Sequence, residues 1–301
     1  MGMILLTGAS GYIGSAIHAS LKRQSISVVT AGRSDCDRFL DLSQDGISPE
    51  LFSNVTVVIH CAGIAHNKGG SSAYRVVNVE ACQAFASAAV AAGVNQFIFL
   101  SSLNVVPAST VDPGASADVL PKPESLYAES KWRAEISLSK LIGPSPCELI
   151  ILRPALVYDI ALAANLAMLQ KWQSRLPVSL PATGRRSLVA RPDLVELIVS
   201  LACGTGKKSA RSGQPLAVTD GQCYSALRIG EALANKTPMK LPAPLWRIVL
   251  GCLAGLPFQR TQALAASLGG SYWCGETAQP FNNAVWSLER LLGAPVTESV
   301  A

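Results

Sequence analysis

The chain of 301 residues is 49% hydrophobic and only 15% charged, which excludes a disordered or fibrous protein because such a composition allows a large apolar core. Its 25 basic and 20 acidic residues give a net charge of +5, and the basic residues are dispersed, with their densest cluster at Arg185-Arg186 and Arg191. Nucleic-acid binders more often carry a basic stripe, so we expect no nucleic-acid partner, and the mild positive charge fits an anionic small molecule equally well.

The first half of the chain alternates short apolar runs with helical patterns. Strands are predicted at Met3–Thr7, Ser27–Ala31, Val55–His60, Gln96–Ser101 and Glu148–Arg153, and helices at Tyr12–Arg23, Val79–Ala92 and Ser125–Leu141. Strands that alternate with helices form right-handed βαβ units, and near-continuous apolar strands are covered on both faces. We therefore predict an α/β fold with a doubly wound parallel Rossmann sheet.

After Pro154 the pattern loosens. Helical patterns at Ala161–Trp172 and Arg191–Leu201 flank a Pro-rich loop at Leu176–Gly184, and Gly, Pro and short helices dominate from Cys203 onward. We predict a dinucleotide-binding domain over residues 1–160 and a smaller, mainly substrate-binding lobe over residues 161–301. A segment near residues 185–203 is expected to return to the first domain.

The spacing of the cysteines and the lengths of the apolar segments indicate the cellular compartment of the protein. The eight cysteines occur singly, without Cys-x-x-Cys or Cys/His pairs at zinc spacing, so we expect no metal site and free thiols in a reducing cytoplasm. The N-terminal run Met1–Leu6 is too short for a signal peptide. The segment Leu245–Phe258 carries Arg247 and is too short to span a bilayer. We expect a buried or interface helix there and no integral membrane segment, with peripheral membrane contact as the less favoured alternative.

A glycine-rich loop follows the first predicted strand and opens the first helix. Residues 7–14 read Thr-Gly-Ala-Ser-Gly-Tyr-Ile-Gly. Such glycines permit a tight turn, approach of the backbone to a pyrophosphate and close packing of helix on strand, while the helix N-terminus favours the anion. The sequence therefore predicts dinucleotide binding by Gly8, Ser10, Gly11, Tyr12, Ile13 and Gly14.

The end of the second strand bears on the choice of cofactor. It reads Ala31-Gly32-Arg33-Ser34, with no acidic residue where NAD-binding proteins hold the ribose hydroxyls. Arg33 can hold the 2′-phosphate of NADP, or it can be a solvated turn residue. We therefore favour NADP(H), with NAD(H) as the alternative, and Asp41-Leu42 as candidates for adenine contact.

A tyrosine and a lysine lie four residues apart, at Tyr127 and Lys131, on one face of a predicted helix. A nearby ammonium favours the phenolate, so we expect it to lower the pKa of Tyr127 and to allow proton exchange near neutral pH. Ser101-Ser102 closes a strand upstream, where a hydroxyl can orient a carbonyl. Alone, the Tyr/Lys pair would be an ordinary surface pair, but its position after a nucleotide loop favours catalysis.

These motifs, with those at residues 60–63, 74–79, 97–102 and 153–154, resemble the extended short-chain dehydrogenase/reductase family in its NAD-dependent epimerase/dehydratase branch, over about residues 3 to 200. The resemblance implies that Tyr127 is the general acid/base, Lys131 its partner and a ribose ligand, and Ser102 the hydroxyl that orients the substrate. It also places further residues at the cofactor: Cys61, Ala62, Gly63, Asn78, Ser101, Pro154 and Ala155.

Within that family the chain most resembles bacterial nucleotide-sugar 4-epimerases and 4-keto reductases of surface-polysaccharide pathways. The resemblance implies that Asn165 and Arg186 contact the diphosphate of a UDP-sugar, with Asp193 after the strand. A solvated loop arginine remains the alternative for Arg186. The chain departs from the family pattern on the sugar side of the site, with Val106-Pro107 and Tyr158-Asp159-Ile160.

The leading functional prediction is a 4-keto-6-deoxy-sugar reductase, in which NADPH delivers hydride to C4 and Tyr127 protonates the oxygen. The alternative is a UDP-sugar 4-epimerase that keeps NAD bound. A non-catalytic nucleotide-sensing protein is the prediction from another class, and the presence of Ser102, Tyr127 and Lys131 argues against it. The resemblance is compatible with a homodimer through the helix that contains Tyr127.

Overall fold

The computed structural model describes residues 2–44, 46–65, 70–106, 123–162, 164–175, 178–205, 212–234, 238–270 and 284–293. The chain divides into two compact units. The first unit comprises Met1–Val105, Leu120–Pro154 and Leu194–Ala217, and the second comprises Val106–Val119, Ala155–Asp193 and Val218–Ala301.

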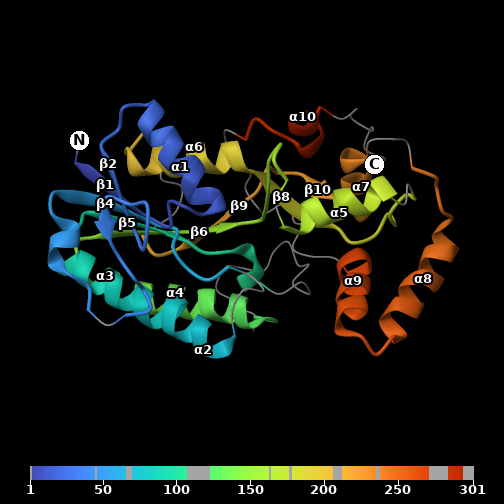
Figure 1. Cartoon of the computed structure of the whole chain (residues 1–301), viewed down its shortest axis with the longest axis horizontal. Helices are drawn as coiled ribbons and strands as arrows, with labels where there is room; N and C mark the ends of the chain where they lie inside the picture. Colours follow the sequence, from blue (N-terminus) through green and yellow to red (C-terminus); the bar gives the residue numbers. More distant parts are fainter. Residues whose placement is uncertain are drawn as a thin grey trace. The chain divides into compact units, whose positions relative to one another are not determined.

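A seven-stranded sheet forms the centre of the first unit, with the strand order β3-β2-β1-β4-β5-β6-β9 (Figure 1). Its strands are β1 (Met3–Thr7), β2 (Val28–Gly32), β3 (Arg38–Phe39), β4 (Val55–His60), β5 (Gln96–Leu100), β6 (Glu148–Pro154) and β9 (Pro215–Val218). The pairs from β3 through β6 are all parallel. The predicted doubly wound parallel Rossmann sheet is confirmed.

Helices cover both faces of this sheet, which is why its central strands are apolar almost throughout. In Figure 1, α1 and α6 lie on one face, and α3 and α4 lie on the other. The helical segments of this part are α1 (Tyr12–Arg23), η1 (Pro49–Phe52), α2 (Ser71–Ala73), η2 (Tyr74–Glu80), α3 (Ala81–Ala91), η3 (Leu103–Val105), α4 (Leu126–Ile142) and α6 (Arg191–Ala202). Phe85 of α3 packs against Phe97 of β5 in the core, with ring centroids 6.1 Å apart.

The second unit contains a three-stranded sheet of order β10-β8-β7, in which β7 and β8 are parallel and β8 and β10 antiparallel. Its elements are β7 (Leu156–Tyr158), α5 (Ala164–Arg175), β8 (Arg186–Ala190), β10 (Cys223–Tyr224), α7 (Ala226–Leu233), α8 (Ala243–Gly255), α9 (Gln259–Gly269) and α10 (Leu288–Leu292). The change of unit falls at Ala155 rather than after residue 160, because β6 runs almost directly into β7. Residues 186–190 belong to the second unit's sheet, so the return to the first unit begins only at Leu194.

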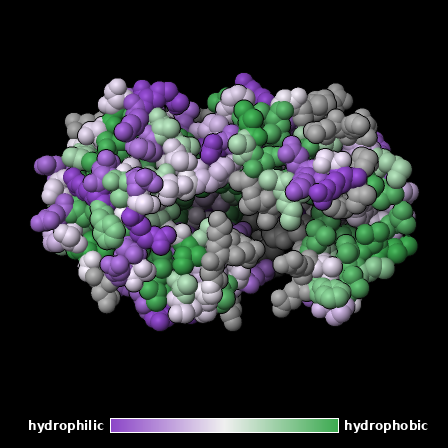
Figure 2. All heavy atoms as spheres, viewed as in Figure 1, coloured by the Kyte–Doolittle hydropathy of each residue, from purple (hydrophilic) through white to green (hydrophobic). Residues whose placement is uncertain are grey.

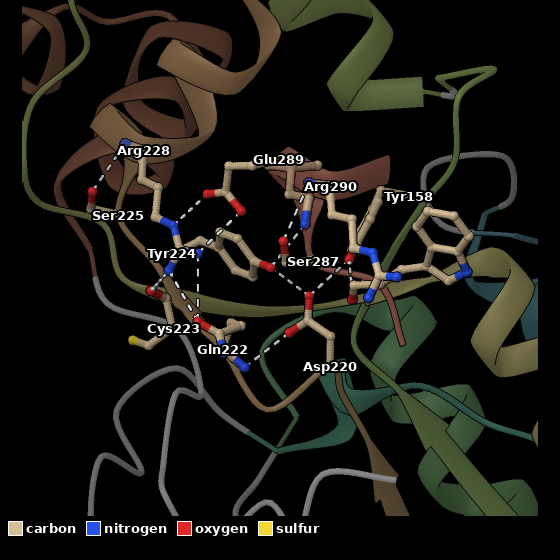
Figure 3. A network of polar contacts seen from close by, with 12 residues as sticks. Tyr158, Asp220, Gln222, Cys223, Tyr224, Ser225, Arg228, Ser287, Glu289 and Arg290 are labelled. Atoms are coloured by element: carbon tan, nitrogen blue, oxygen red, sulfur yellow. Dashed lines mark hydrogen bonds and ion pairs between the residues drawn. The ribbon is translucent and has the colours of Figure 1, made fainter. Parts of the chain in front are cut away.

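Two tyrosine hydroxyls converge on one buried carboxylate in the second unit (Figure 3). Tyr158 and Tyr224 donate hydrogen bonds to Asp220 Oδ2 at 2.9 and 2.6 Å. Arg228 of α7 lies over the Tyr224 ring and pairs with Glu289 of α10. This network joins β7, β10, α7 and α10 through polar groups that the interior would otherwise leave unpaired.

One cysteine contradicts the expectation of free thiols, because Cys223 is disulfide-bonded. The described cysteines at positions 36, 61, 82, 147, 203 and 252 are free. Spacing in the sequence is uninformative about cysteines that only the fold brings together, which is why the bond at Cys223 was not predicted.

Apolar side chains gather on the surface over α8 and α9 (Figure 2). Of the α8 side chains, Trp246 is buried and donates a hydrogen bond to the Ser179 carbonyl, whereas Leu245 and Ile248 are 43% and 62% exposed. The predicted helix near Leu245–Phe258 is therefore present, with one buried side. None of the helices in the described part of the chain combines the length and hydropathy needed to cross a bilayer.

Candidate active site

The glycine loop lies where β1 ends beside β4, at the point where the strand order reverses. Gly8 has φ +71°, and its carbonyl accepts a hydrogen bond from Gly11 N at 2.9 Å. A Cβ at Gly14 would lie 2.1 Å from the Gly8 oxygen, and a Cβ at Gly8 would lie 2.7 Å from Ala62 N. Glycine is therefore required at both positions, one for the turn and one for the approach of α1 to the loop.

Gly11 differs from the other two loop glycines. Among the described atoms, a Cβ there would meet only the Gly8 oxygen, at 3.2 Å. That side of the loop is open, so a pyrophosphate can approach the backbone at the N-terminus of α1. The loop thus fits the dinucleotide that the sequence predicted.

The end of β4 is fixed to β1 by a buried threonine. Thr7 Oγ1 lies 3.0 Å from His60 Nδ1 and accepts a hydrogen bond from Ala62 N at 3.2 Å. Burial lowers the pKa of His60 to about 3, so its imidazole is neutral at physiological pH. Burial also raises the pKa of the Cys61 thiol to about 12, which leaves it without thiolate character. These residues line the nucleotide edge of the sheet and offer no acid or base there.

Asn78 fixes the backbone of the loop that follows β4, at Ile64. Its Oδ1 accepts from Ile64 N at 2.7 Å, and its Nδ2 donates to the Ile64 carbonyl and to Ser130 Oγ. Asn78 lies in η2, a π-helix that ends where α3 begins, so the helix predicted from residue 79 consists of two elements. The side-chain amide therefore ties the β4 loop to α4. The sequence assigned Asn78 to the cofactor and did not predict this positioning role.

Lys131 of α4 lies in the interior of the first unit. Its ammonium donates a hydrogen bond to the Leu100 carbonyl at 2.9 Å and lies 4.8 Å from the centre of the Phe99 ring. Burial lowers the pKa of Lys131. Ser125 caps the helix by accepting a hydrogen bond from Ala128 N, which places Tyr127 in the first turn and Lys131 one turn later.

Tyr127 and Ser102 share a hydrogen bond, so α4 and the segment after β5 meet at these side chains. Burial raises the pKa of Tyr127 to about 12, while the bond with Ser102 acts in the opposite direction. The expectation that Lys131 would lower this pKa is wrong for the structure, because desolvation of the phenol outweighs the other influences. The phenol is therefore protonated at neutral pH.

The Ser101 hydroxyl is bonded inside the fold, and its contact with the cofactor stays a prediction. Its hydroxyl donates to Glu135 Oε1 at 2.5 Å, and Glu135 pairs with Arg153, all three side chains being buried. The structure thus separates Ser101, which bonds to a carboxylate inside the fold, from Ser102, which bonds to Tyr127. The sequence motif contained Arg153 but did not indicate Glu135 as its partner.

The end of β2 carries the residues predicted to select the cofactor. Arg33 is exposed. Hydrogen bonds from the Ser43 hydroxyl and backbone lower the pKa of Asp41, and the charge of Arg33 adds a smaller effect in the same direction. Asp37 instead accepts hydrogen bonds from Thr30 N and Oγ1, both at 2.8 Å. The Leu42 side chain is 8% exposed and lies in the apolar core, so adenine contact by that side chain is not supported.

The remaining predicted residues lie at or beyond the end of β6. Pro154 ends that strand, and Ala155 N donates to the Val218 carbonyl at 2.9 Å. Arg186 lies in β8 and donates from Nε to the Gly184 carbonyl at 3.1 Å. The Asn165 side chain and Pro107 lie outside the described residues.

Asp193 also belongs to this group, and it has a structural partner. Its Oδ2 accepts hydrogen bonds from Val285 N and Trp286 N, so the carboxylate anchors a distant segment of the second unit. In the described part of the chain, no group of three His, Cys, Asp or Glu side chains could hold a metal ion.

Comparison with known proteins places this geometry in a family. Residues 4–211 match the model of the NAD dependent epimerase/dehydratase family. A UDP-glucose 4-epimerase of Vibrio cholerae is 33% identical over 270 residues, which cover 81% of this chain and 79% of that protein.

Two solved structures share the fold at lower identity. Bordetella bronchiseptica WbmG in complex with NAD has a TM-score of 0.71 at 16% identity, covering 97% of this chain and 92% of that one. The UDP-glucose 4-epimerase of Thermotoga maritima with UDP-glucose has a TM-score of 0.67 at 17% identity, covering 96% of each chain. From the family match and the Vibrio relative, we conclude that the chain belongs to the NAD dependent epimerase/dehydratase family.

Proposed function

We propose that the chain is an NAD-dependent UDP-sugar 4-epimerase, which oxidises C4 of the sugar and reduces it again on the opposite face. The observation that carries the proposal is the Ser102–Tyr127 hydrogen bond beside buried Lys131, at the sheet edge that carries the glycine loop. The relative that is 33% identical has this activity by name. Solved neighbours hold NAD or UDP-glucose, which supports the same cofactor and substrate class here.

In this proposal each side chain has one task. Because the Tyr127 phenol is protonated in the free protein, it must first release its proton to solvent when cofactor and substrate bind. The phenolate then takes the proton from the C4 hydroxyl on oxidation and returns it on reduction, and Ser102 holds the substrate oxygen in place. Lys131 supplies the positive charge that stabilises the phenolate when it forms. Bound NAD supplies the hydride acceptor and donor. Arg186 is our proposed contact for the UDP diphosphate, since an arginine fork fits phosphate oxygens.

A second candidate is the 4-keto reductase, and two observations favour it. The Tyr127 phenol is protonated at neutral pH, the form needed to donate a proton to a keto oxygen. Arg33 is exposed at the end of β2, where it can reach a 2′-phosphate of NADPH. The two candidates differ in net redox change, because the epimerase regenerates its cofactor and the reductase consumes it.

The test follows from that difference. The purified chain is incubated with UDP-glucose and with UDP-N-acetylglucosamine, and the 4-epimers are separated by chromatography without added NADH. Formation of either epimer at substoichiometric cofactor supports the epimerase. Stoichiometric oxidation of NADPH by a UDP-4-keto-6-deoxy sugar, with no epimer, supports the reductase. Absence of both reactions, together with an unchanged melting temperature in NAD and in UDP, would refute the assignment.

Arg33 provides the discriminating variant. If the chain is the reductase, the wild type binds NADPH about ten-fold more tightly than NADH, because a charge-assisted hydrogen bond contributes about 1.5 kcal/mol or more. Arg33→Ala then removes the preference, whereas the matched Asp41→Asn, which removes a nearby negative charge, should increase it slightly. Equal affinities in the wild type remove the case for the reductase.

A further inference from the structure

Three buried polar side chains form a cluster directly behind the proposed catalytic residues. Ser101 follows β5, Glu135 lies on α4 one turn after Lys131, and Arg153 lies near the end of β6. Glu135 Oε1 accepts from Ser101 Oγ at 2.5 Å and from Arg153 Nε at 2.9 Å, while Oε2 accepts from Arg153 Nη2 at 2.5 Å. The three residues are 4%, 4% and 5% exposed.

Stability alone does not account for a charged pair at this depth. Transfer of two charges from water to an interior is unfavourable, and apolar replacements of similar volume are often as stable or more stable. Nor does any step proposed above use these side chains. What distinguishes the cluster is its place, because each of its members is next to a residue of the site: Ser101 beside Ser102, Glu135 one turn from Lys131, and Arg153 beside Pro154.

The charge of the cluster acts on Lys131. Glu135 favours the charged form of Lys131, whereas burial disfavours it. Arg153 offsets the Glu135 charge through its paired contacts. Other titratable groups around the ammonium are His60 and Cys61 at the end of β4 and Cys82 on α3. All three have pKa values that keep them neutral at physiological pH, so Glu135 is the charged group among those that act on the ammonium.

We propose that Ser101, Glu135 and Arg153 are positioning residues that fix α4 against the carboxyl ends of β5 and β6, and that their balanced charges maintain the electrostatic environment of Lys131 and Tyr127. The cluster ties the strand end that precedes Ser102 to the helix that carries Lys131, without a part in the reaction itself. This inference deepens the proposed function and rests on it for its activity measurement alone.

The test exploits the sign of the charge removed. Glu135→Gln leaves the Arg153 charge unbalanced, which favours phenolate at Tyr127, so the pH profile of kcat/KM moves to lower pH. Arg153→Gln leaves the Glu135 charge unbalanced, and the profile moves to higher pH. We expect each shift to be about half a pH unit or more. The double variant returns the profile toward that of the wild type.

Matched controls come from the same helix. Glu129 and Arg133 form an ion pair on the exposed side of α4, with side chains 38% and 57% exposed. Glu129→Gln and Arg133→Gln remove the same charges and should leave the profile in place, because solvent screens them. Ser101→Ala removes one contact without a charge and should lower kcat several-fold with no shift of the profile.

One further measurement keeps the outcome decisive. The dissociation constant of NADH is measured against pH for every variant. Its pH dependence should move to lower pH in Glu135→Gln and to higher pH in Arg153→Gln, even if the chain has no epimerase activity. If one of the single variants does not fold, the proposal is tested with the double variant, in which both charges are removed, and with Ser101→Ala. Single variants that shift the profile in one common direction, or a double variant that shifts as far as either single one, would overturn the proposal.

Discussion

At the residue scale, Tyr127 shows how burial and catalysis oppose each other. The phenol lies among side chains that favour its neutral form, including the Tyr74 ring at 6.1 Å. Its hydrogen bond with Ser102 favours the anion, and a positive charge brought near the phenol would act in the same sense. The proton of Tyr127 is therefore held until a substrate oxygen and a positive charge act on it together.

Replacement of Tyr127 by phenylalanine isolates this proton. The ring keeps its packing while the hydroxyl is lost, so we expect turnover to fall by about 10²–10⁴-fold and NADH affinity to stay within a few-fold. Steady-state kinetics and fluorescence titration measure the two quantities. Tyr74→Phe is the matched control, since it removes a hydroxyl that, within the described part of the chain, donates to the Ala65 carbonyl. Near wild-type turnover in Tyr127→Phe would show that another group transfers the proton.

At the scale of the element, the glycine loop and α1 depend on one contact. A methyl group at Gly14 would lie 2.1 Å from the Gly8 carbonyl oxygen, and backbone must move to admit it. We expect Gly14→Ala to lower the melting temperature and to weaken NADH binding by about 5- to 150-fold, because overpacking costs about 1–3 kcal/mol.

Gly251 in α8 is the matched control for that substitution. A Cβ there meets none of the described atoms within 4 Å. Gly251→Ala should raise stability by about 0.5–1 kcal/mol, since alanine is the better helix former. Equal responses of the two variants in calorimetry and in NADH titration would contradict the role given to Gly14.

The elements that could be predicted from the sequence are those with a simple period. β4 and β5 are apolar runs bounded by turns, and the glycine loop between β1 and α1 has a motif of fixed spacing. η2 was not predicted because a π-helix of seven residues is too short for its spacing of apolar residues to be recognised in the sequence. The resemblance implied a strand between Arg186 and Asp193, where β8 lies. The short strand β7 has no such signal, because it pairs only with β8, far along the chain.

The candidate site divides in the same way. The spacing of Tyr127 and Lys131 on one helix is local, so their proximity followed from the sequence. The bonds of Asn78 to Ser130 and of Ser101 to Glu135 join residues far apart in the chain. Such partners depend on the register of strands and helices, which no local pattern contains.

At the scale of the whole molecule, the network around Asp220 makes stability depend on pH. Burial raises the pKa of Asp220 to about 6, against an ordinary value near 3.9. The folded state therefore binds this proton more tightly than the unfolded chain. The contribution of Asp220 is greatest below about pH 4, declines as the pH rises to about 6, and amounts to about 3 kcal/mol in all.

Comparison with Asp220→Asn measures that contribution. We expect the unfolding free energy of the wild type, relative to that of the variant, to decrease as the pH rises from about 4 to 6 and to stay constant above pH 6. Asp37 and Glu289, whose pKa values are lowered, act in the opposite direction but are common to both proteins. Urea unfolding at a series of pH values gives the difference, and a difference that is constant across this range would contradict the assignment.

The last strand of the first unit's sheet has a consequence for how the chain is made. β9 borders β6 in the sheet, yet residues 155–193 of the second unit separate the two strands in the chain. As the ribosome extends the chain, the outer edge of β6 has no neighbour until residues 215–218 emerge. An exposed strand edge invites pairing with other chains. A nascent chain stalled before residue 215 should therefore be prone to aggregation and should require a chaperone that the finished protein does not.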